Sequence, residues 1–205
     1  MRHLGFARFH LVGHDRGART AHRMALDAPE AVASLAVMDI VPTLLLLEQL
    51  SHPVARAYYH WFFLAQPAPF PETMIGHDPD AFFERCLTGW GGGGLSGFDQ
   101  GRLAAYRAAW RRPGTIRAMC ADYRDTLDHD LALDSADRDR RVACPALVLW
   151  GEDGAMARAF DMAETWADRL KDMRARALPG GHFFPDEHPD ETAAALLDFL
   201  ADLPL

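Results

Sequence analysis

Hydrophobic runs alternate with amphipathic stretches at both ends of this chain. Four runs have the length and apolar character of buried strands, at residues 9–13, 32–39, 144–151 and 174–178. Other segments repeat apolar positions at helical spacing and are predicted to be helices, at residues 17–28, 158–170 and 189–200. Strands that alternate with helices are typical of an α/β protein with a doubly wound, mostly parallel sheet.

The middle of the chain lacks this alternation. Between about residues 43 and 134 the strand patterns vanish, and helical stretches rich in Tyr, Trp and Phe take their place. This segment is predicted to be a helical cap inserted over one edge of the sheet. The expected division is a core part at residues 1–43, the helical cap at residues 44–134 and a second core part at residues 135–205.

The first predicted strand runs directly into Gly13-His14-Asp15-Arg16-Gly17, and a predicted helix follows. A strand, a tight Gly-x-Asp-x-Gly turn and a helix are typical of a nucleophile elbow, with Asp where lipases carry Ser. The two glycines are expected to permit a strained backbone at this turn. A carboxylate at the elbow displaces a leaving group from carbon through an ester intermediate.

Two arginines lie close to the elbow Asp. Arg16 follows Asp15 directly and Arg19 comes three residues later, so both lie on one face of the predicted helix. Guanidinium forks match the geometry of carboxylates. We therefore expect a small anionic substrate.

Acidic residues and a histidine follow the other predicted strands. Asp39 ends the second strand, Glu152 and Asp153 follow the third, and His182 lies in a Gly-Gly-His loop after the fourth. The carboxyl ends of parallel strands meet at one edge of a sheet, where active residues gather. A catalytic His needs a carboxylate partner, and the pattern leaves Asp39, Asp153 and Glu152 open for that role.

Composition narrows the cellular setting and the partners. The formal net charge of −8 disfavours nucleic acid and anionic membranes as partners. The three cysteines are scattered and the histidines have no metal-binding spacing, so we expect neither a disulfide framework nor a metal site. The longest leucine run, at residues 44–47, is too short for a bilayer, and the first residues lack a signal-peptide core. A cytoplasmic protein is predicted, with a symmetric dimer as the default assembly.

The beginning of the chain raises a separate expectation. Only about eight residues precede the first predicted strand, yet this strand is apolar on both faces, which is typical of a position inside a sheet. We expect that another chain covers it or that Met1 is an internal methionine. A truncated, inactive fragment is therefore one alternative interpretation of the sequence.

From Phe9 onward the chain resembles the fluoroacetate (haloacetate) dehalogenases of the α/β-hydrolase superfamily. The resemblance covers nearly the whole chain. It is carried by His14–Arg19 (HDRGAR), the 35–42 strand ending in Asp39, and the sequences YHW at 59–61, QPAP at 66–69, MCADYR at 119–124 and GHF at 181–183. The fold that it implies is the C-terminal half of an α/β-hydrolase with a helical cap.

The resemblance implies roles for the core residues. Asp15 would attack the carbon that bears the halogen, and His182 would activate water against the resulting ester. Asp39 is the acid that the resemblance places beside His182, with Asp153 as the alternative. Arg16 and Arg19 would bind the carboxylate of the substrate.

The resemblance also implies roles for the cap. His60, Trp61 and Tyr123 would donate hydrogen bonds to the departing halide, and Trp90 would line the same pocket. The implied reaction converts fluoroacetate and water into glycolate and fluoride, with no metal and no organic cofactor. An epoxide hydrolase is the nearest enzymatic alternative, since it also uses an elbow Asp but needs cap tyrosines as acids and has no use for an arginine pair.

Overall fold

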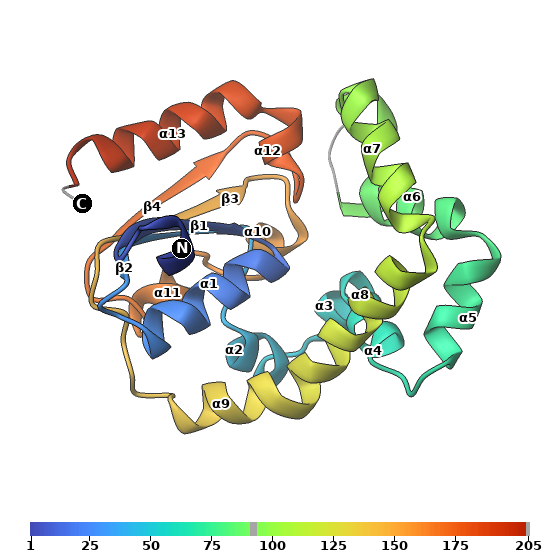
Figure 1. Ribbon diagram of the computed structural model, residues 1–205, viewed down its shortest axis with the longest axis horizontal. Helices are drawn as coiled ribbons and strands as arrows, with labels where there is room; N and C mark the ends of the chain where they lie inside the picture. Colours follow the sequence, from blue (N-terminus) through green and yellow to red (C-terminus); the bar gives the residue numbers. More distant parts are fainter. Residues whose placement is uncertain (91–93, 204–205) are drawn as a thin grey trace.

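The chain folds around a parallel sheet of four strands. The computed structural model describes residues 1–90 and 94–203. The strands lie side by side in chain order, as β1 (Phe9–His14), β2 (Val32–Met38), β3 (Ala146–Gly151) and β4 (Met173–Leu178) (Figure 1). Every neighbouring pair is parallel. The predicted α/β class is confirmed, and each predicted strand forms with one end shifted by one or two residues.

Different helices cover the two faces of the sheet. The helices that pack on it are α1 (Arg16–Asp27), α11 (Glu164–Ala167), α12 (Phe184–Glu187) and α13 (Pro189–Ala201). Successive residues of β2 alternate between the faces: Leu35 and Val37 pack with α1 and α11, whereas Ala36 and Met38 pack with α12 and α13. Because both faces are covered, the strand is apolar except for the buried Ser34, as parallel strands usually are.

Small side chains bring α1 close to the sheet. Ala18, Ala21 and Ala25 are buried on the side of α1 that faces β2. Their spacing of three and four residues places them on one face of the helix. This close packing fixes the first turn of α1, and with it the turn that carries Asp15.

β1 occupies one edge of the sheet. It pairs with β2 along its length and with no other strand among the described residues. Val12 of this strand is 42% exposed, although the apolar sequence predicts a position inside a sheet. The other side of β1 therefore presents unpaired backbone groups within the described part of the chain.

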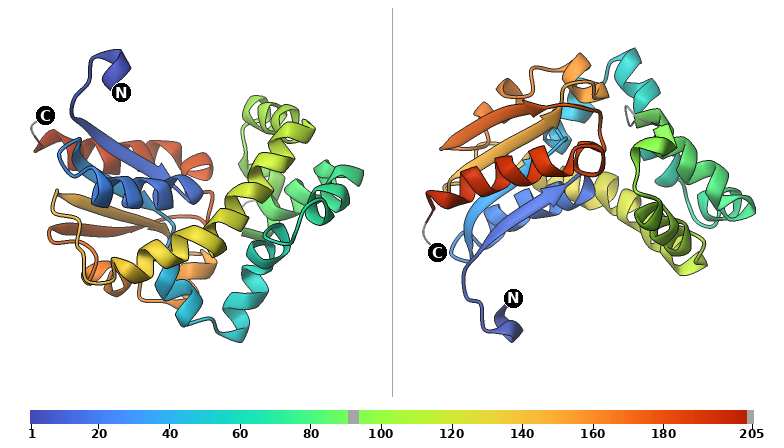
Figure 2. Two further views of the ribbon diagram at one scale, coloured as in Figure 1. Left: turned by 60° about the horizontal axis from the view of Figure 1, so that its bottom comes forward. Right: turned by 90° about the horizontal axis from the view of Figure 1, so that it is seen from above.

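Helices fill the segment between β2 and β3. In chain order they are α2 (Thr43–Glu48), α3 (His52–Ala57), α4 (Tyr59–Leu64), α5 (Phe70–His77), α6 (Pro79–Trp90), the 3-10 turn η2 (Gly94–Gly97), α7 (Gln100–Trp110), α8 (Pro113–Asp125), the π-helical turn η3 (Thr126–Asp130) and α9 (Leu131–Ala136). As predicted, the described residues of this segment form no strand. Figures 1 and 2 show α3 to α8 gathered beside the carboxyl ends of the strands.

A hydrophobic cluster joins these helices to the sheet. Trp61 and Tyr123 pack in one cluster with Val41, which follows β2, and with Met156 of α10 (Ala155–Ala159). The helices therefore lie over the strand ends with an apolar contact between them. A short 3-10 turn, η1 (Arg2–Leu4), precedes β1.

The single helix predicted at residues 158–170 is wrong. The structure has α10 and α11 there, separated by Phe160, whose backbone is extended with φ −136° and ψ 151°. Met162 packs in the cluster beneath the cap helices, whereas Trp166 packs against the sheet. Residues four apart share one face of a helix, so a continuous helix cannot send these two side chains into different clusters.

Candidate active site

The turn between β1 and α1 places Asp15 at the carboxyl edge of the sheet. Its backbone has φ 50° and ψ −123°, a region sparsely populated by residues other than glycine. A Cβ at Gly13 would lie 2.5 Å from the backbone oxygen of Gly17, so only glycine permits this close approach. A Cβ at Gly17 itself would meet nothing within 4 Å. The tight turn thus depends on Gly13 and not on Gly17.

Asp39 accepts a hydrogen bond from His182 at the end of β2. The His182 Nδ1 lies 2.7 Å from Asp39 Oδ2, and the backbone N–H of Gly151 donates to Asp39 Oδ1 at 3.1 Å. Asp39 is buried and also has a positive φ of 51°. The Asp153 side chain is exposed, and the described residues include no contact between it and His182. The geometry joins His182 to Asp39.

Glycines let the His182 loop approach β3. A Cβ at Gly151 would lie 2.1 Å from the backbone oxygen of Gly181, and Gly180 has a φ of +94°. The backbone N–H of His182 then donates to the carbonyl of Trp90 at 2.9 Å, which ties the loop to α6. The loop is therefore fixed from the sheet side and from the cap side.

His14 links the elbow to the same loop. Its Nε2–H donates to the backbone oxygen of His182 at 2.8 Å, and the two rings lie 4.7 Å apart. Burial and the nearby charge of His182 lower the pKa of His14. His14 is therefore a neutral donor, and its hydrogen bond helps to hold the backbone of His182 in place.

Two carboxylates favour the protonated form of His182. Burial lowers the pKa of His182, but its contacts with Asp15 and Asp39 outweigh burial and raise it. Burial likewise opposes ionisation of Asp15, yet the contact with His182 and the charges of His182 and Arg19 bring the pKa of Asp15 well below its usual range. The His182 Nε2 lies 3.8 Å from Asp15 Oδ2, too far for a hydrogen bond. The pair is thus a carboxylate facing an imidazolium.

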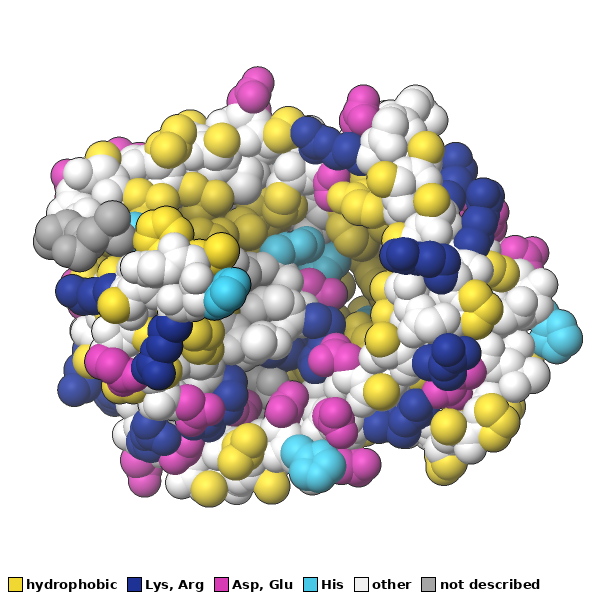
Figure 3. Space-filling view, viewed as in Figure 1, with side chains coloured by type: hydrophobic (Ala, Val, Ile, Leu, Met, Phe, Trp, Pro, Cys, Tyr) yellow, Lys and Arg dark blue, Asp and Glu magenta, His cyan; other side chains and the backbone are white. Residues whose placement is uncertain are grey.

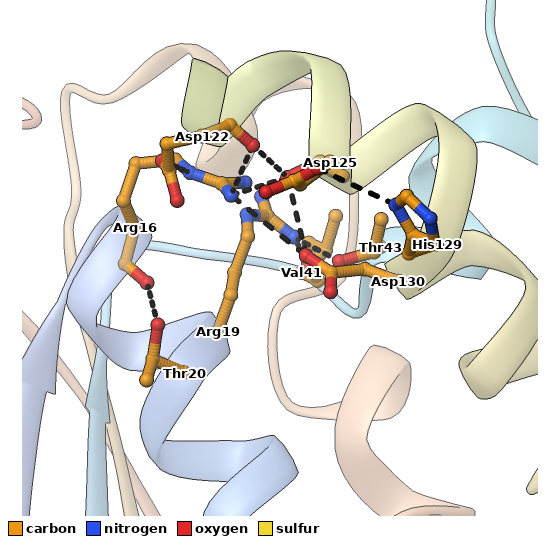
Figure 4. A network of polar contacts seen from close by, with 10 residues as sticks. Arg16, Arg19, Thr20, Val41, Thr43, Asp122, Asp125, His129 and Asp130 are labelled. Carbon is orange, nitrogen blue, oxygen red and sulfur yellow. Dashed lines mark hydrogen bonds and ion pairs between the residues drawn. The ribbon is translucent and has the colours of Figure 1, made fainter. Parts of the chain in front are cut away.

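Arg16 is held by the end of α8 and the turn that follows it (Figure 4). Its Nε donates to Asp122 Oδ2 at 2.6 Å, and its Nη2 donates to the Thr126 hydroxyl. Thr126 in turn contacts Asp130 at 3.2 Å within η3. The last turns of α8 and the π-helical turn therefore supply one partner each for this guanidinium.

Arg19 points inward from the next turn of α1. Its Nη1 donates to the carbonyl of Val41 at 2.9 Å and to the Thr43 hydroxyl at 3.0 Å. Its guanidinium lies 4.5 Å from the centre of the Trp61 ring. Arg19 is 7% exposed, so its guanidinium is largely withdrawn from solvent and lies against the Trp61 ring.

Several guanidinium nitrogens lack acceptors. The buried atoms without a hydrogen-bond partner in the described structure include Arg16 Nη1 and Arg19 Nε and Nη2. A buried cationic donor without an acceptor is costly, and native proteins rarely leave one unsatisfied. The two arginines therefore retain capacity for an anion.

Two cavities reach Asp15. The larger, which we call the elbow cavity, measures about 640 Å³ and is lined by Asp15, Arg16 and side chains of α6 and α8. Figure 3 shows the hollow between the sheet half and the cap helices, with apolar, histidine and acidic side chains in it. The smaller, which we call the His182 pocket, holds Asp15, Asp39 and His182 together. Arg19 lines neither; it borders a separate cavity of about 440 Å³ beside α1, together with Arg16.

The cap residues predicted around Asp15 divide into two groups. His60 and Trp90 line both cavities, and Tyr123 lines the elbow cavity. Burial lowers the pKa of His60 to about 3, and its Nδ1 is a buried atom without a partner in the described structure. Trp61 is 1% exposed and does not line these cavities; it lies behind them, against Tyr123.

Sequence reasoning missed three residues at the site. Tyr58 lines the His182 pocket, Asp122 orients Arg16, and His14 braces His182. Only His14 carried a signal that was available beforehand, because it stands inside the elbow motif. Tyr58 and Asp122 come from cap helices whose orientation the sequence pattern does not determine.

The described residues contain neither a cluster of metal ligands nor a helix that could span a membrane. Within residues 1–90 and 94–203, no three His, Cys, Asp or Glu side chains gather closely enough to hold a metal ion. The helices in these ranges are also too short or too polar to traverse a bilayer.

Known proteins resemble this chain over almost its whole length. The fluoroacetate dehalogenase of a Burkholderia species is 56% identical over 202 residues, which are 98% of this chain and 66% of that protein. The soluble epoxide hydrolase of Corynebacterium sp. strain C12 is 26% identical over 204 residues, which are 98% of this chain and 70% of that protein. The chain spans about two thirds of the length of these relatives.

Solved structures share the same architecture. The crystal structure of a Nostoc sp. PCC 7120 protein, provisionally assigned to the α/β hydrolases, superposes with a TM-score of 0.95 at 45% identity, covering 98% of this chain and 69% of that one. The alpha/beta hydrolase fold family matches residues 1–189. The predicted resemblance is confirmed at this level. With its parallel sheet and with Asp15 on the turn after β1, the chain belongs to the alpha/beta hydrolase fold family.

Proposed function

We propose that the chain carries the machinery for hydrolytic dehalogenation of haloacetates, converting fluoroacetate and water into glycolate and fluoride through an ester on Asp15. The observation that carries the proposal is the convergence of Asp15, His182 and Asp39 at one sheet edge. The similarity to the Burkholderia fluoroacetate dehalogenase supports the choice of substrate class. In this proposal residues 1–43 and 135–205 form the catalytic core, and residues 44–134 form the cap.

The first step uses the carboxylate of Asp15. Its lowered pKa keeps the side chain ionised and ready to attack. One carboxylate oxygen forms a bond to the carbon that bears fluorine, and the carbon–fluorine bond breaks with its electron pair leaving on fluoride. An ester of Asp15 results.

The second step follows from the change in charge. Once Asp15 is an ester, its negative charge no longer holds a proton on His182, so the pKa of His182 falls. His182 then releases its proton, accepts one from water and directs the water at the ester carbonyl. Glycolate leaves, Asp15 is restored, and one proton is released to solvent in the whole reaction. Asp39 keeps the imidazole in the orientation that this step needs.

The carboxylate of the substrate and the departing halide are proposed to bind to different hydrogen-bond donors. The free donor of Arg16, which lines the elbow cavity with Asp15, suits a carboxylate, and Arg19 offers further free donors from the cavity that also borders Arg16. His60 and Tyr123 stand on the cap side of Asp15, where their N–H and O–H groups suit fluoride. Trp61, one layer behind, would support the halide site through Tyr123.

An epoxide hydrolase is the second candidate. Two cap tyrosines, Tyr58 and Tyr123, line the cavities that contain Asp15, and tyrosines are the acids that epoxide opening requires. The paired arginines favour the haloacetate, because an epoxide offers no anion for them.

A substrate comparison separates these functions. The chain is incubated with fluoroacetate and, separately, with styrene oxide, and fluoride and diol are measured. The proposal predicts fluoride release with little diol. Diol formation without fluoride would favour the epoxide hydrolase. The absence of both products would refute both proposed functions for this chain.

A further inference from the structure

A wide groove lies beside the candidate active site, between α3, α6 and α10. Its volume is about 780 Å³. Arg56 of α3, Arg85 of α6 and Arg158 of α10 line it together with His52. We call this feature the arginine groove. All three arginines are exposed, so their charges face the solvent inside it.

The charges of the arginine groove are not neutralised. None of the three arginines forms an ion pair or a side-chain hydrogen bond within the described residues, and no Asp or Glu lines the groove. The chain as a whole has 29 acidic and 21 basic residues, so an acid-free basic surface runs against its overall charge. A cleft lined by one sign of charge concentrates ions of the opposite sign.

The arginine groove borders the His182 pocket directly. Trp90 and Ala155 line both spaces, so these two residues form the boundary between them. Asp15 and His182 lie on the inner side of that boundary. An anion held among the arginines is therefore one layer of side chains away from the nucleophile.

We propose that the arginine groove is the electrostatic approach route by which an anionic substrate reaches Asp15; the substrate class rests on the function proposed above. The competing route, through the elbow cavity, is lined by Arg16 and by three carboxylates, Asp15, Asp122 and Asp186, and is otherwise mainly aromatic and apolar. Carboxylates outnumber arginine there, whereas the charged side chains described in the groove are all arginines. The three arginines act at a distance and touch no reacting atom.

This role makes a kinetic prediction. Steering changes how often the substrate is captured, not how fast it reacts once bound, so kcat/KM depends on the groove and kcat does not. The attraction weakens as salt rises, because the Debye length falls to about 10 Å at 0.1 M ionic strength.

The test compares two triple variants. Arg56→Gln, Arg85→Gln and Arg158→Gln together remove the groove charges. Arg8→Gln, Arg112→Gln and Arg117→Gln remove the same charge from exposed positions outside the groove. At low ionic strength the groove variant should lose about tenfold in kcat/KM for fluoroacetate with unchanged kcat, and added salt should shrink that loss. The control variant should stay near wild type. Equal effects of the two variants would overturn the proposal.

A second readout does not depend on turnover. Iodide and neutral acrylamide both quench tryptophan, and subtracting the signal of a Trp90→Phe variant isolates Trp90. The proposal predicts that the groove variant loses severalfold in iodide quenching of Trp90 while acrylamide quenching is unchanged. An unchanged iodide value refutes the groove. If the wild type releases no fluoride, the dehalogenase function fails, and the iodide measurement alone decides for or against the groove.

Discussion

The sheet edge and the cap build the site in different ways. Asp15, Asp39 and His182 follow three different strands, yet the parallel sheet brings them together. His182 Nδ1 lies 2.7 Å from Asp39 Oδ2, and His182 Nε2 lies 3.8 Å from Asp15 Oδ2. Their positions follow from backbone topology. The cap contributes its side chains from short helices whose orientation depends on mutual packing. The positions of the proposed nucleophile and base therefore follow from the fold, whereas the positions of the proposed halide donors follow from helix packing.

The largest expected effect lies at the sheet edge. His182→Asn should release at most about one fluoride per site and then stop, because nothing activates water against the ester. Rapid-quench fluoride measurements and intact-protein mass would reveal the burst and the trapped ester. His129→Asn, at an exposed position of η3, is the matched control and should turn over normally. Steady turnover by the His182 variant would remove that residue from its role.

The partner of His182 should come next. Asp39→Asn should lower kcat by about three to four orders of magnitude, because the imidazole loses the carboxylate that orients it. Asp153→Asn tests the alternative acid and should have little effect on kcat, since its exposed side chain does not contact His182. The reverse ranking of the two variants would overturn the assignment from geometry.

A cap substitution should weaken the reaction without stopping it. His60→Leu removes one donor from the wall of the Asp15 cavities and should reduce kcat for fluoroacetate by about a hundredfold. Chloroacetate, with a better leaving group, should be affected less. His77→Leu, on the exposed end of α5, is the control. Equal losses on both substrates would argue against halide stabilisation by His60.

The smallest effect concerns stability and pH. The folded pKa of His182 is raised, so its charged form stabilises the fold below the pH where an unfolded His titrates, about 6.5. That contribution disappears as the pH rises through the folded pKa. The free energy of unfolding of the wild type, measured with denaturant, should therefore exceed that of His182→Asn by the largest amount at about pH 6. A stability gap that widens toward alkaline pH would contradict the raised pKa.

The features that the sequence predicts lie mainly at the sheet edge, and those that it does not predict lie mainly in the cap. The four strands, the elbow at Asp15 and the strand-end positions of Asp39 and His182 were predictable, because apolar runs and Gly-rich turns report backbone topology. The choice of Asp39 over Asp153 as partner of His182 needed the family resemblance. Sequence pattern does not reveal that Phe160 breaks the helix after β3, since that break serves two separate clusters.

Less of the cap could be predicted from the sequence. Its helical character was predictable, but the contact of Arg16 with Asp122 across 106 positions was not. Neither was the placement of Trp61 behind the cavities and of Tyr58 within the His182 pocket. Such contacts depend on how short helices pack against one another, and no periodic pattern in the sequence determines that packing.

Isotope labelling tests the ester on Asp15 most directly. The chain is taken through one turnover of fluoroacetate in heavy-oxygen water, and glycolate and the peptide containing Asp15 are weighed by mass spectrometry. An ester intermediate predicts that the first glycolate carries ordinary oxygen from Asp15, while the heavy oxygen appears in the Asp15 carboxylate. Heavy oxygen in the first glycolate, with none in the peptide, would mean that water attacks the substrate directly and would contradict the account.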